Sequence, residues 1–239
     1  MNGRQIKHPA KGLYKQNSKK KYTSNKEMLR KTFFAFVITC LLSSCQHSLL
    51  TSDSFTVNDL KNCDLLFHAA PQSNAITEVT QGVNKERIDH VAIFFKQNGK
   101  KCVIEAIDSG VVITPLEKFL ERKGKVIAGR LNGNVNKKKT IRTALSYLGR
   151  PYDHLYMHDN DAIYCSELVE LSFVDKQGKR IFQPIPMSFH DENGEIISYW
   201  KEFYSAHGMQ VPEGEPGSNP GDLSRKKNVI IKHLETKQQ

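Results

Sequence analysis

A β-hairpin is the clearest pattern of apolar and polar positions along this chain. Residues 90–96 and 101–107 are rich in β-branched and aromatic side chains, which favour strands. Between them lies Asn98-Gly99, a dipeptide that two-residue hairpin turns prefer. A turn at these two residues fixes the register of both strands. The pattern therefore predicts the hairpin together with its pairing.

An amphipathic helix is the second clear pattern, over residues 165–173. Its apolar residues recur at a spacing of three to four, as expected for one buried helical face. Cys165 and Ser166, a residue type that favours helix starts, fall in the first turn. The sequence therefore predicts a thiol at a helix N-terminus.

Shorter elements occupy the rest of the C-terminal part. The same two kinds of pattern predict strands at 64–67 and 126–131, and helices at 75–81, 116–121, 137–148 and 198–207. Gly208 follows the last of these as a C-cap glycine. Strands with helices beside them, in this mixed order, indicate an α+β fold.

The hairpin and the cysteine helix together suggest nucleophilic chemistry. Unpaired N–H groups at a helix N-terminus stabilise an anion, which favours the thiolate form of Cys165. A nucleophile also needs a base and a group that orients the base. The hairpin register makes His90 and Glu105 diagonal neighbours on one face, about 7 to 8 Å apart at the backbone. We interpret Cys165, His90 and Glu105 as nucleophile, base and orienting carboxylate.

Each of these residues also has an ordinary structural interpretation. A cysteine at a helix start is often a small buried residue, a histidine at a strand end often lies at the rim, and a strand glutamate usually faces solvent. Glu105, however, is the only acidic residue between Val91 and Ile107 and has apolar neighbours in sequence. Burying an unpaired charge there would be costly, so a partner is expected.

The region around Cys165 resembles a known family. A Gly-x-Pro-Tyr segment at 149–152 followed by Cys-Ser-x-Leu-Val at 165–169 is similar to the cysteine motif of the NlpC-type cell-wall hydrolases. In those proteins the histidine follows the cysteine, whereas here His90 comes first. This order resembles the circularly permuted branch, the YiiX and YaeF type of permuted papain-like amidases. The resemblance covers roughly residues 64–234, with shorter matches at 64–67, 114–116, 186–189 and 219–224.

The resemblance implies a permuted papain-like fold, with a central antiparallel sheet or small barrel packed against the cysteine helix. It also implies that Cys165 and His90 are catalytic and that Glu105 completes a triad. The expected activity is hydrolysis of amide bonds through a thioester, without a cofactor, on peptidoglycan stem peptides. Two alternatives are an acyl hydrolase or acyltransferase acting on lipids or peptides, and a cell-wall binding module without turnover.

Two tyrosines close to the cysteine are candidates for stabilising the oxyanion of the tetrahedral intermediate. Tyr152 and Tyr164 each carry a hydroxyl that could donate a hydrogen bond to such a group. The alternative for either residue is a half-buried aromatic side chain whose hydroxyl is hydrogen-bonded to the backbone.

The N-terminal segment predicts export. Residues 32–44 form an apolar run of thirteen after Arg30-Lys31, too short to span a bilayer core of about 30 Å. This run predicts a secretory signal, and Leu-Ser-Ser-Cys at 42–45 resembles the lipobox of bacterial lipoproteins. The alternatives are an ordinary cleaved signal or a buried strand.

With the lipobox interpretation, residues 1–44 are leader and signal peptide, with Met28 as an alternative start. Residues 45–54 are then the lipidated Cys45 and a tether, and 55–239 are the hydrolase domain. Acyl chains on Cys45 would anchor the protein to a membrane of the cell envelope. By the same resemblance, Gln46 permits sorting to an outer membrane.

Charge argues against a nucleic-acid partner. The chain has 35 basic and 25 acidic residues, but residues 1–44 contain ten of the basic and one of the acidic ones. The predicted exported part therefore has 25 against 24 and is almost neutral.

A metal site is a rival hypothesis for the segment between the two cysteine motifs. Asp153-His154, His158-Asp159 and Asp161 lie within nine residues, and His-x-x-x-His spacing would align two imidazoles on a helix. The Asp, Asn and Tyr content of the segment favours a loop, so we expect no metal there.

Overall fold

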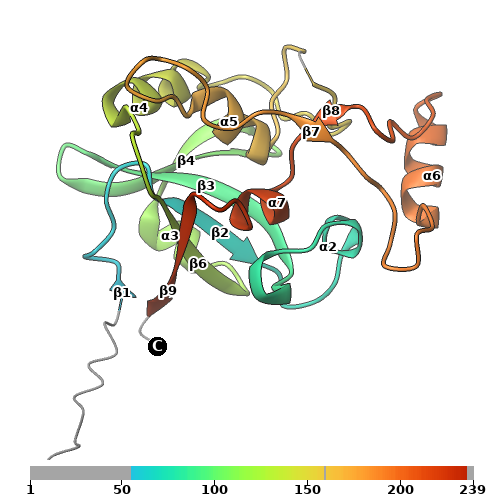
Figure 1. Ribbon diagram of the computed structural model, residues 1–239, viewed down its shortest axis with the longest axis horizontal. Helices are drawn as coiled ribbons and strands as arrows, with labels where there is room; N and C mark the ends of the chain where they lie inside the picture. Colours follow the sequence, from blue (N-terminus) through green and yellow to red (C-terminus); the bar gives the residue numbers. More distant parts are fainter. Residues whose placement is uncertain (1–54, 159, 236–239) are drawn as a thin grey trace, which may run out of the picture. The chain divides into compact units, whose positions relative to one another are not determined.

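The computed structural model describes residues 55–158 and 160–235 (Figure 1). The predicted signal peptide, the alternative start at Met28, the lipidation of Cys45 and the tether to residue 54 lie outside the described residues and stay predictions. Among the described residues, no helix is long and apolar enough to cross a membrane.

A seven-stranded sheet forms the centre of the described part. All neighbouring strands pair antiparallel except β1 and β9, which are parallel. In sheet order, the strands are β1 Phe55–Thr56, β9 Val229–Glu235, β6 Lys125–Leu131, β2 Leu65–Ala69, β3 Ile88–Gln97, β4 Lys100–Ile107 and β5 Gly110–Pro115. The expected α+β fold with a central antiparallel sheet is confirmed, and the sheet is open, with β1 and β5 at its edges.

Helices and a second, two-stranded sheet complete the described part (Figure 1). The small sheet pairs β7 Ile185–Pro186 with β8 Pro216–Gly217. The helices are α2 Ala75–Val79, the 3-10 turn η1 Val83–Lys85, α3 Leu116–Leu120, α4 Lys137–Ser146, α5 Cys165–Ser172, α6 Ser198–Ala206 and α7 Pro220–Ser224. The structure thus contains β5, β9 and α7, which the pattern did not predict.

The hairpin forms with the predicted register. Strand β3 pairs with β4 from Gln97–Lys100 back to Ile93–Ile104. Asn98 and Gly99 have φ angles of 49° and 79°, and two consecutive positive values are those of the turn that matches strand twist. Gly208, predicted to end α6, has a φ of 68°, as a C-cap glycine should.

Both faces of the sheet are buried, because alternate residues of each strand pack into different clusters. Val91, Ile93 and Ile104 belong to the cluster that contains α5 residues and Ala144 of α4. Ala92, Phe94 and Val103 belong to a second cluster, with residues of α3. Figure 1 shows α4 and α5 together on one side of the sheet. The period of two along β3 and β4 therefore sorts side chains between two layers.

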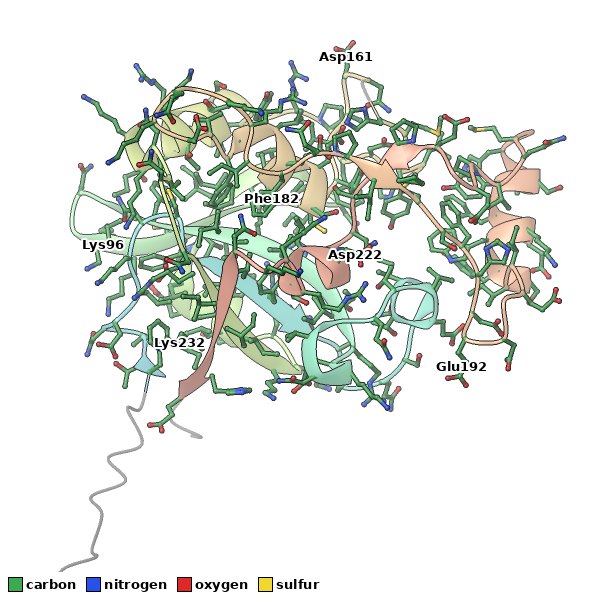
Figure 2. The ribbon with its side chains drawn as sticks, in the orientation of Figure 1. Lys96, Asp161, Phe182, Glu192, Asp222 and Lys232 are labelled. Atoms are coloured by element: carbon green, nitrogen blue, oxygen red, sulfur yellow. The ribbon has the colours of Figure 1, made fainter. Side chains whose placement is uncertain are left out.

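Phe182, labelled in Figure 2, belongs to the apolar cluster that contains residues of α5. Phe182 is 2% exposed and packs edge-on against Phe173, with ring centroids 5.6 Å apart. Lys96 and Lys232, both labelled in Figure 2, are exposed on strands of the sheet. These lysines are solvated, whereas apolar contacts such as that between Phe182 and Phe173 help to hold α5 in place.

Candidate active site

The structure places Cys165 at the first position of α5, as predicted. Tyr164, not Ser166, is at the N-cap, with an extended backbone and no side-chain cap. Helical bonding starts with the Leu168 N–H donating to Tyr164 O. The amide groups before Leu168 therefore have no partner within the helix, which is the environment that stabilises an anion. The Cys165 side chain is almost completely buried.

Glu167 supports the start of this helix from within. Its carboxylate accepts a hydrogen bond from the backbone N–H of Tyr164, three residues earlier, as in half of a capping box. Burial raises the pKa of Glu167 to about 7, against the lowering effect of that hydrogen bond. The residue before Cys165 is thus held by a buried carboxyl group, which limits movement of the thiol.

His90 lies between Glu105 and Cys165. Its Nε2 atom is 2.7 Å from Glu105 Oε2, and the ring also shares a hydrogen bond with Cys165. Burial disfavours the charged imidazolium and would lower the pKa of His90. The hydrogen bonds to Cys165 and Glu105 have the larger effect together and raise this pKa to about 9. Because Nε2 is taken, Nδ1 is the ring nitrogen left for the thiol.

Glu105 is fully buried and receives hydrogen bonds from three side chains. Besides His90, Thr114 Oγ1 donates to Oε1 at 2.5 Å, and Arg122 donates to both oxygens at 2.6 and 2.7 Å. Burial alone would raise the pKa of Glu105, yet the bonds from His90, Arg122 and Thr114 lower it to about 2. The carboxylate is therefore charged and held in one orientation.

Arg122 and Thr114 are the residues that sequence reasoning missed. Arg122 follows α3, and its guanidinium lies 4.7 Å from the ring centroid of Phe119. Thr114 is on β5, a strand that was not predicted. The expected burial of Glu105 did indicate such partners, because a buried glutamate needs a cation and hydrogen-bond donors. Which of the many basic residues supplies the charge could not be read from spacing.

The two candidate tyrosines differ in their surroundings. The hydroxyl of Tyr164 accepts the backbone N–H of Ser218 at 3.0 Å, so the backbone-bonded alternative describes this residue. Burial and the charge on Cys165 raise the pKa of Tyr152, which also shares a hydrogen bond with Tyr156. Tyr156, missed from sequence, has its pKa raised to about 12 by burial and by Cys165. Tyr152 and Tyr156 thus interact electrostatically with Cys165.

The segment that prompted the rival metal hypothesis is arranged around Asp153. The segment after Asp153 is a loop, and this carboxylate accepts the N–H groups of Leu155 and Met157 and the side chain of Asn160. His158 lies 3.2 Å from Glu170 of the cysteine helix, and Asp159 lies outside the described residues. Within residues 55–158 and 160–235, no group of three His, Cys, Asp or Glu side chains is arranged to hold a metal ion.

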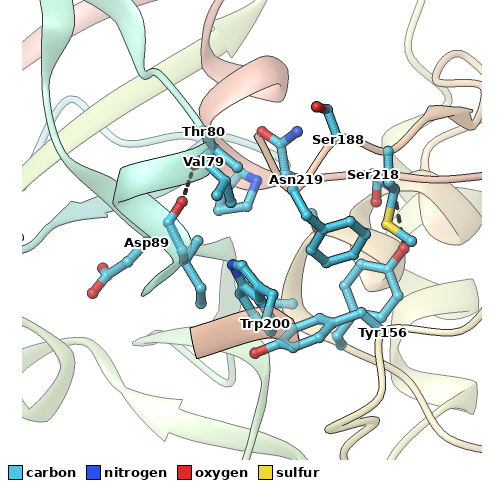
Figure 3. A pocket seen from close by; sticks show the side chains of 15 residues that line it. Val79, Thr80, Asp89, Tyr156, Ser188, Trp200, Ser218 and Asn219 are labelled. Carbon is cyan, nitrogen blue, oxygen red and sulfur yellow. Dashed lines mark hydrogen bonds between the residues drawn. The ribbon is translucent and has the colours of Figure 1, made fainter. Parts of the chain in front are cut away.

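A cavity of about 50 Å³ opens beside Cys165 (Figure 3). Figure 3 shows Val79 and Thr80 on one side of it and Tyr156 and Ser218 on the other. The lining residues are Ile76, Val79, Thr80, Asp89, Tyr156, Tyr164, Cys165, Ser166, Met187, Ser188, Phe189, Trp200, Ser218, Asn219 and Pro220. The thiol therefore has a small, mainly apolar space next to it.

A helix-initial cysteine beside a strand histidine on an antiparallel sheet is the arrangement of papain-like cysteine hydrolases. Residues 59–228 match the model of one such family, described as permuted papain-like amidase enzyme, YaeF/YiiX, C92 family. The chain therefore belongs to the family of permuted papain-like amidases, and the expectation drawn from its motifs is confirmed.

Two relatives from Escherichia coli show how far the similarity extends. The uncharacterized protein YiiX of strain K12 is 27% identical over 163 residues, which cover 66% of this chain and 78% of YiiX. The crystal structure of metalloprotein yiiX from strain O157:H7 gives a TM-score of 0.60 at 25% identity. The structural match covers 73% of this chain and 97% of the yiiX chain. The term metalloprotein is part of the description of that structure.

Proposed function

We propose that the chain is a cysteine amidase in which Cys165 is the nucleophile, His90 transfers the proton and Glu105 orients the imidazole. The observation that carries the proposal is the continuous path of hydrogen bonds from Glu105 through His90 to Cys165. Membership of the amidase family gives the reaction class, and this path gives each residue a distinct role.

In the proposed reaction, the Cys165 thiolate attacks the carbonyl carbon of an amide. Protonated His90 gives its Nδ1 proton to the leaving nitrogen as the C–N bond breaks, which leaves a thioester on Cys165. Neutral His90 then takes a proton from water, and the resulting hydroxide attacks the thioester carbon. The C–S bond breaks, and the acid product leaves with the proton back on His90.

The surroundings of Glu105 support its orienting role. Hydrogen bonds from Arg122 and Thr114 keep Glu105 charged. Glu105 can therefore accept a hydrogen bond from the Nε2–H of His90 while the proton stays on the imidazole. Arg122 and Thr114 act through their hydrogen bonds to Glu105, so they are positioning residues in this scheme. We propose that one of the two predicted tyrosines is the oxyanion donor. Tyr152 interacts electrostatically with Cys165, and the Tyr164 hydroxyl accepts the Ser218 N–H but keeps its own proton to donate.

The leading substrate is an amide bond of peptidoglycan stem peptides, with acyl transfer as the alternative outcome. We also propose that the protein is exported and anchored through Cys45 in the cell envelope, as the lipobox-like segment 42–45 suggests. Replacing Cys45 with alanine should abolish incorporation of a labelled fatty acid into the protein. Retention of the label in this variant would contradict the anchor without affecting the amidase proposal.

Cys165→Ala is the direct test of the amidase. The full chain and the variant are incubated with peptidoglycan fragments and with simple N-acyl amides, and products are identified by mass spectrometry. We expect new fragments with the original chain and none with Cys165→Ala. Cys102→Ala is a matched control, because Cys102 is a buried thiol of the same core cluster, away from the helix start.

The outcomes separate the alternatives. Products that persist in Cys165→Ala would refute the cysteine amidase. If N-acyl amides are hydrolysed but no fragment is released from peptidoglycan, the substrate would instead be an acyl group on another molecule. Binding of peptidoglycan that is equal in both proteins, without any product, would favour the non-catalytic module.

A further inference from the structure

The cavity beside Cys165 is built by segments that are far apart in the sequence. Its walls come from α2, from residues 187–189, from α6 and from residues 218–220, and Cys165 and Ser166 also line it (Figure 3). The aromatic cluster of α6 supports one wall, where Trp200 packs edge-on against both Tyr156 and Phe189. Such a packed wall defines the shape of whatever lies next to the thiol.

The cavity offers no free charge to a ligand. Among the described residues, no lysine, arginine or histidine lines it. Asp89 is the one lining carboxylate, and its oxygens are already bound to His68 Nδ1 and Asn74 Nδ2, each at 2.8 Å. A charged group placed here would lose its water without gaining a partner, which is costly. The occupant should therefore be uncharged.

Most polar atoms of the wall are also engaged. Trp200 donates its ring N–H to Ala75 O at 3.2 Å, and the Tyr164 hydroxyl takes the Ser218 N–H. Ser166 differs from these, as does Ser218, because the hydroxyl oxygen of each is buried and has no hydrogen-bond partner among the described residues. A buried polar atom without a partner requires an explanation, and a ligand atom in the adjoining cavity would supply the missing bond.

The volume limits the size of the occupant. A cavity of about 150 Å³ is enough to hold benzene, which has six carbon atoms. The cavity here is about 50 Å³. On the same scale it holds a group of about two or three carbon atoms. Side chains of alanine to valine size and short acyl groups fit this limit, whereas a fatty acyl chain does not.

We propose that this cavity is the specificity pocket for a short, uncharged aliphatic group next to the scissile amide. In this proposal the Ser166 hydroxyl bonds a polar backbone atom of the substrate beside that group. The inference rests on the proposed function, since it assumes that Cys165 attacks an amide. It narrows the substrate to amides of small aliphatic residues or short acyl groups.

The test measures labelling of Cys165 by a series of chloromethyl ketones, followed by intact mass. Attack by Cys165 on the methylene carbon expels chloride and leaves a thioether, so no hydrolysis is needed. The series carries methyl, isopropyl, heptyl, carboxyethyl or aminobutyl groups. We expect the isopropyl reagent to react at least tenfold faster than the heptyl and charged reagents. The same groups in amide substrates should rank in the same order of kcat/KM.

Two variants resize the pocket. Val79→Ala, which enlarges it from a half-buried position on α2, should bring the heptyl reagent within threefold of the isopropyl reagent. Val57→Ala is the matched control, because Val57 is also half-buried but packs in the cluster on the other side of the sheet. It should leave the preference unchanged. Ser166→Ala should slow labelling by the isopropyl reagent severalfold and leave labelling by iodoacetamide unchanged.

The outcomes distinguish this inference from the amidase itself. A flat profile, or a preference for heptyl or charged reagents, would overturn the pocket even if amides are hydrolysed. So would a preference that Val57→Ala alters as much as Val79→Ala does. Size-selective labelling without hydrolysis of any amide would support the pocket and refute the proposed amidase.

Discussion

Strand β3 takes part in two histidine–carboxylate pairs that look alike but are built differently. In the first, His90 contacts Glu105 through Nε2 and keeps Nδ1 for Cys165. In the second, His68 contacts Asp89 through Nδ1, but its Nε2 donates to the carbonyl of Lys123 at 2.8 Å. Both nitrogens of His68 are therefore occupied. A histidine can transfer protons only where one nitrogen remains free for the reacting group, so the first pair suits chemistry and the second suits structure.

The second pair has its own task. Asp89 binds His68 with one oxygen and Asn74 with the other, and Asn74 is the N-cap of α2. Since α2 forms a wall of the cavity beside Cys165, this chain of hydrogen bonds fixes the wall to the sheet. One strand thus holds both the pair proposed for proton transfer and a pair that fixes a wall of the cavity.

The largest expected effect separates the two histidines. His90→Ala removes the group that moves the proton, so we expect kcat/KM of amide hydrolysis to fall roughly a thousandfold or more. His68→Ala is the matched control and should lower kcat by no more than about threefold. Equal losses in both variants, measured on protein of verified fold, would contradict the assignment of distinct roles.

Glu105→Gln should have the next largest effect, roughly a hundredfold on kcat, because the orienting charge is lost. It should also change the pH profile. With its pKa at about 9, His90 keeps its proton at neutral pH, and activity should fall as pH rises through about 9. Without the carboxylate, burial lowers the pKa of His90, so this alkaline limb should move to lower pH. An unshifted limb would show that Glu105 does not set the proton affinity of His90.

Stability should follow pH through the same pair. The raised pKa of His90, from 6.5 to about 9, gives stability that is complete below about pH 6.5 and lost as pH rises through about 9. The lowered pKa of Glu105, from 4.5 to about 2, gives stability that is present above about pH 4.5 and lost as pH falls through about 2. Urea unfolding should therefore find the full contribution of both groups between about pH 4.5 and 6.5.

Arg122→Ala should lower kcat about tenfold and leave KM unchanged, because Glu105 loses its bidentate partner but His90 and Cys165 remain. Arg122→Lys should restore only part of kcat, since lysine cannot bind both oxygens. The matched control is Arg130→Ala, which removes a similar guanidinium from Asp64 on the same sheet. It should reduce stability with little change in kcat. A rise in KM alone would argue for a substrate contact by Arg122.

The smallest effect on kcat is expected for Asp89→Asn. This change weakens the bonds to His68 and Asn74 and loosens α2, so we expect KM to rise about threefold and unfolding free energy to fall by about 1 kcal/mol. The kcat value should stay within a factor of two. A large loss of kcat would mean that Asp89 acts on the His90 side of the strand after all.

Local patterns were enough to predict the parts of the site that depend on neighbours in sequence. The Asn98-Gly99 turn determined which strand residues face each other, and thereby the contact between His90 and Glu105. The apolar spacing after Cys165 likewise determined where α5 begins. Element ends shifted by one to a few residues, as for α4, which ends at Ser146 rather than at 148.

The remaining parts depend on contacts between distant segments. Arg122, Thr114 and Tyr156 reach the site from a helix end, an edge strand and a loop, and none of these positions follows from periodicity. Strands β5 and β9 lie at or near the sheet edge, where the apolar signal is weak. The cavity wall joins α2, α6 and two loops, so only the folded chain defines it.

The order of the site residues along the chain has a consequence for folding. His90 and Glu105 are separated by a single tight hairpin, whose closure requires ordering only a short loop. Cys165 must join from a segment about sixty residues further on, after β5, β6 and α4 have been placed. During synthesis the base and its carboxylate can therefore pair before the nucleophile has left the ribosome. We expect the Cys165 thiol to become reactive only in the last stage of folding. The appearance of rapid alkylation at Cys165 would therefore report when folding is complete.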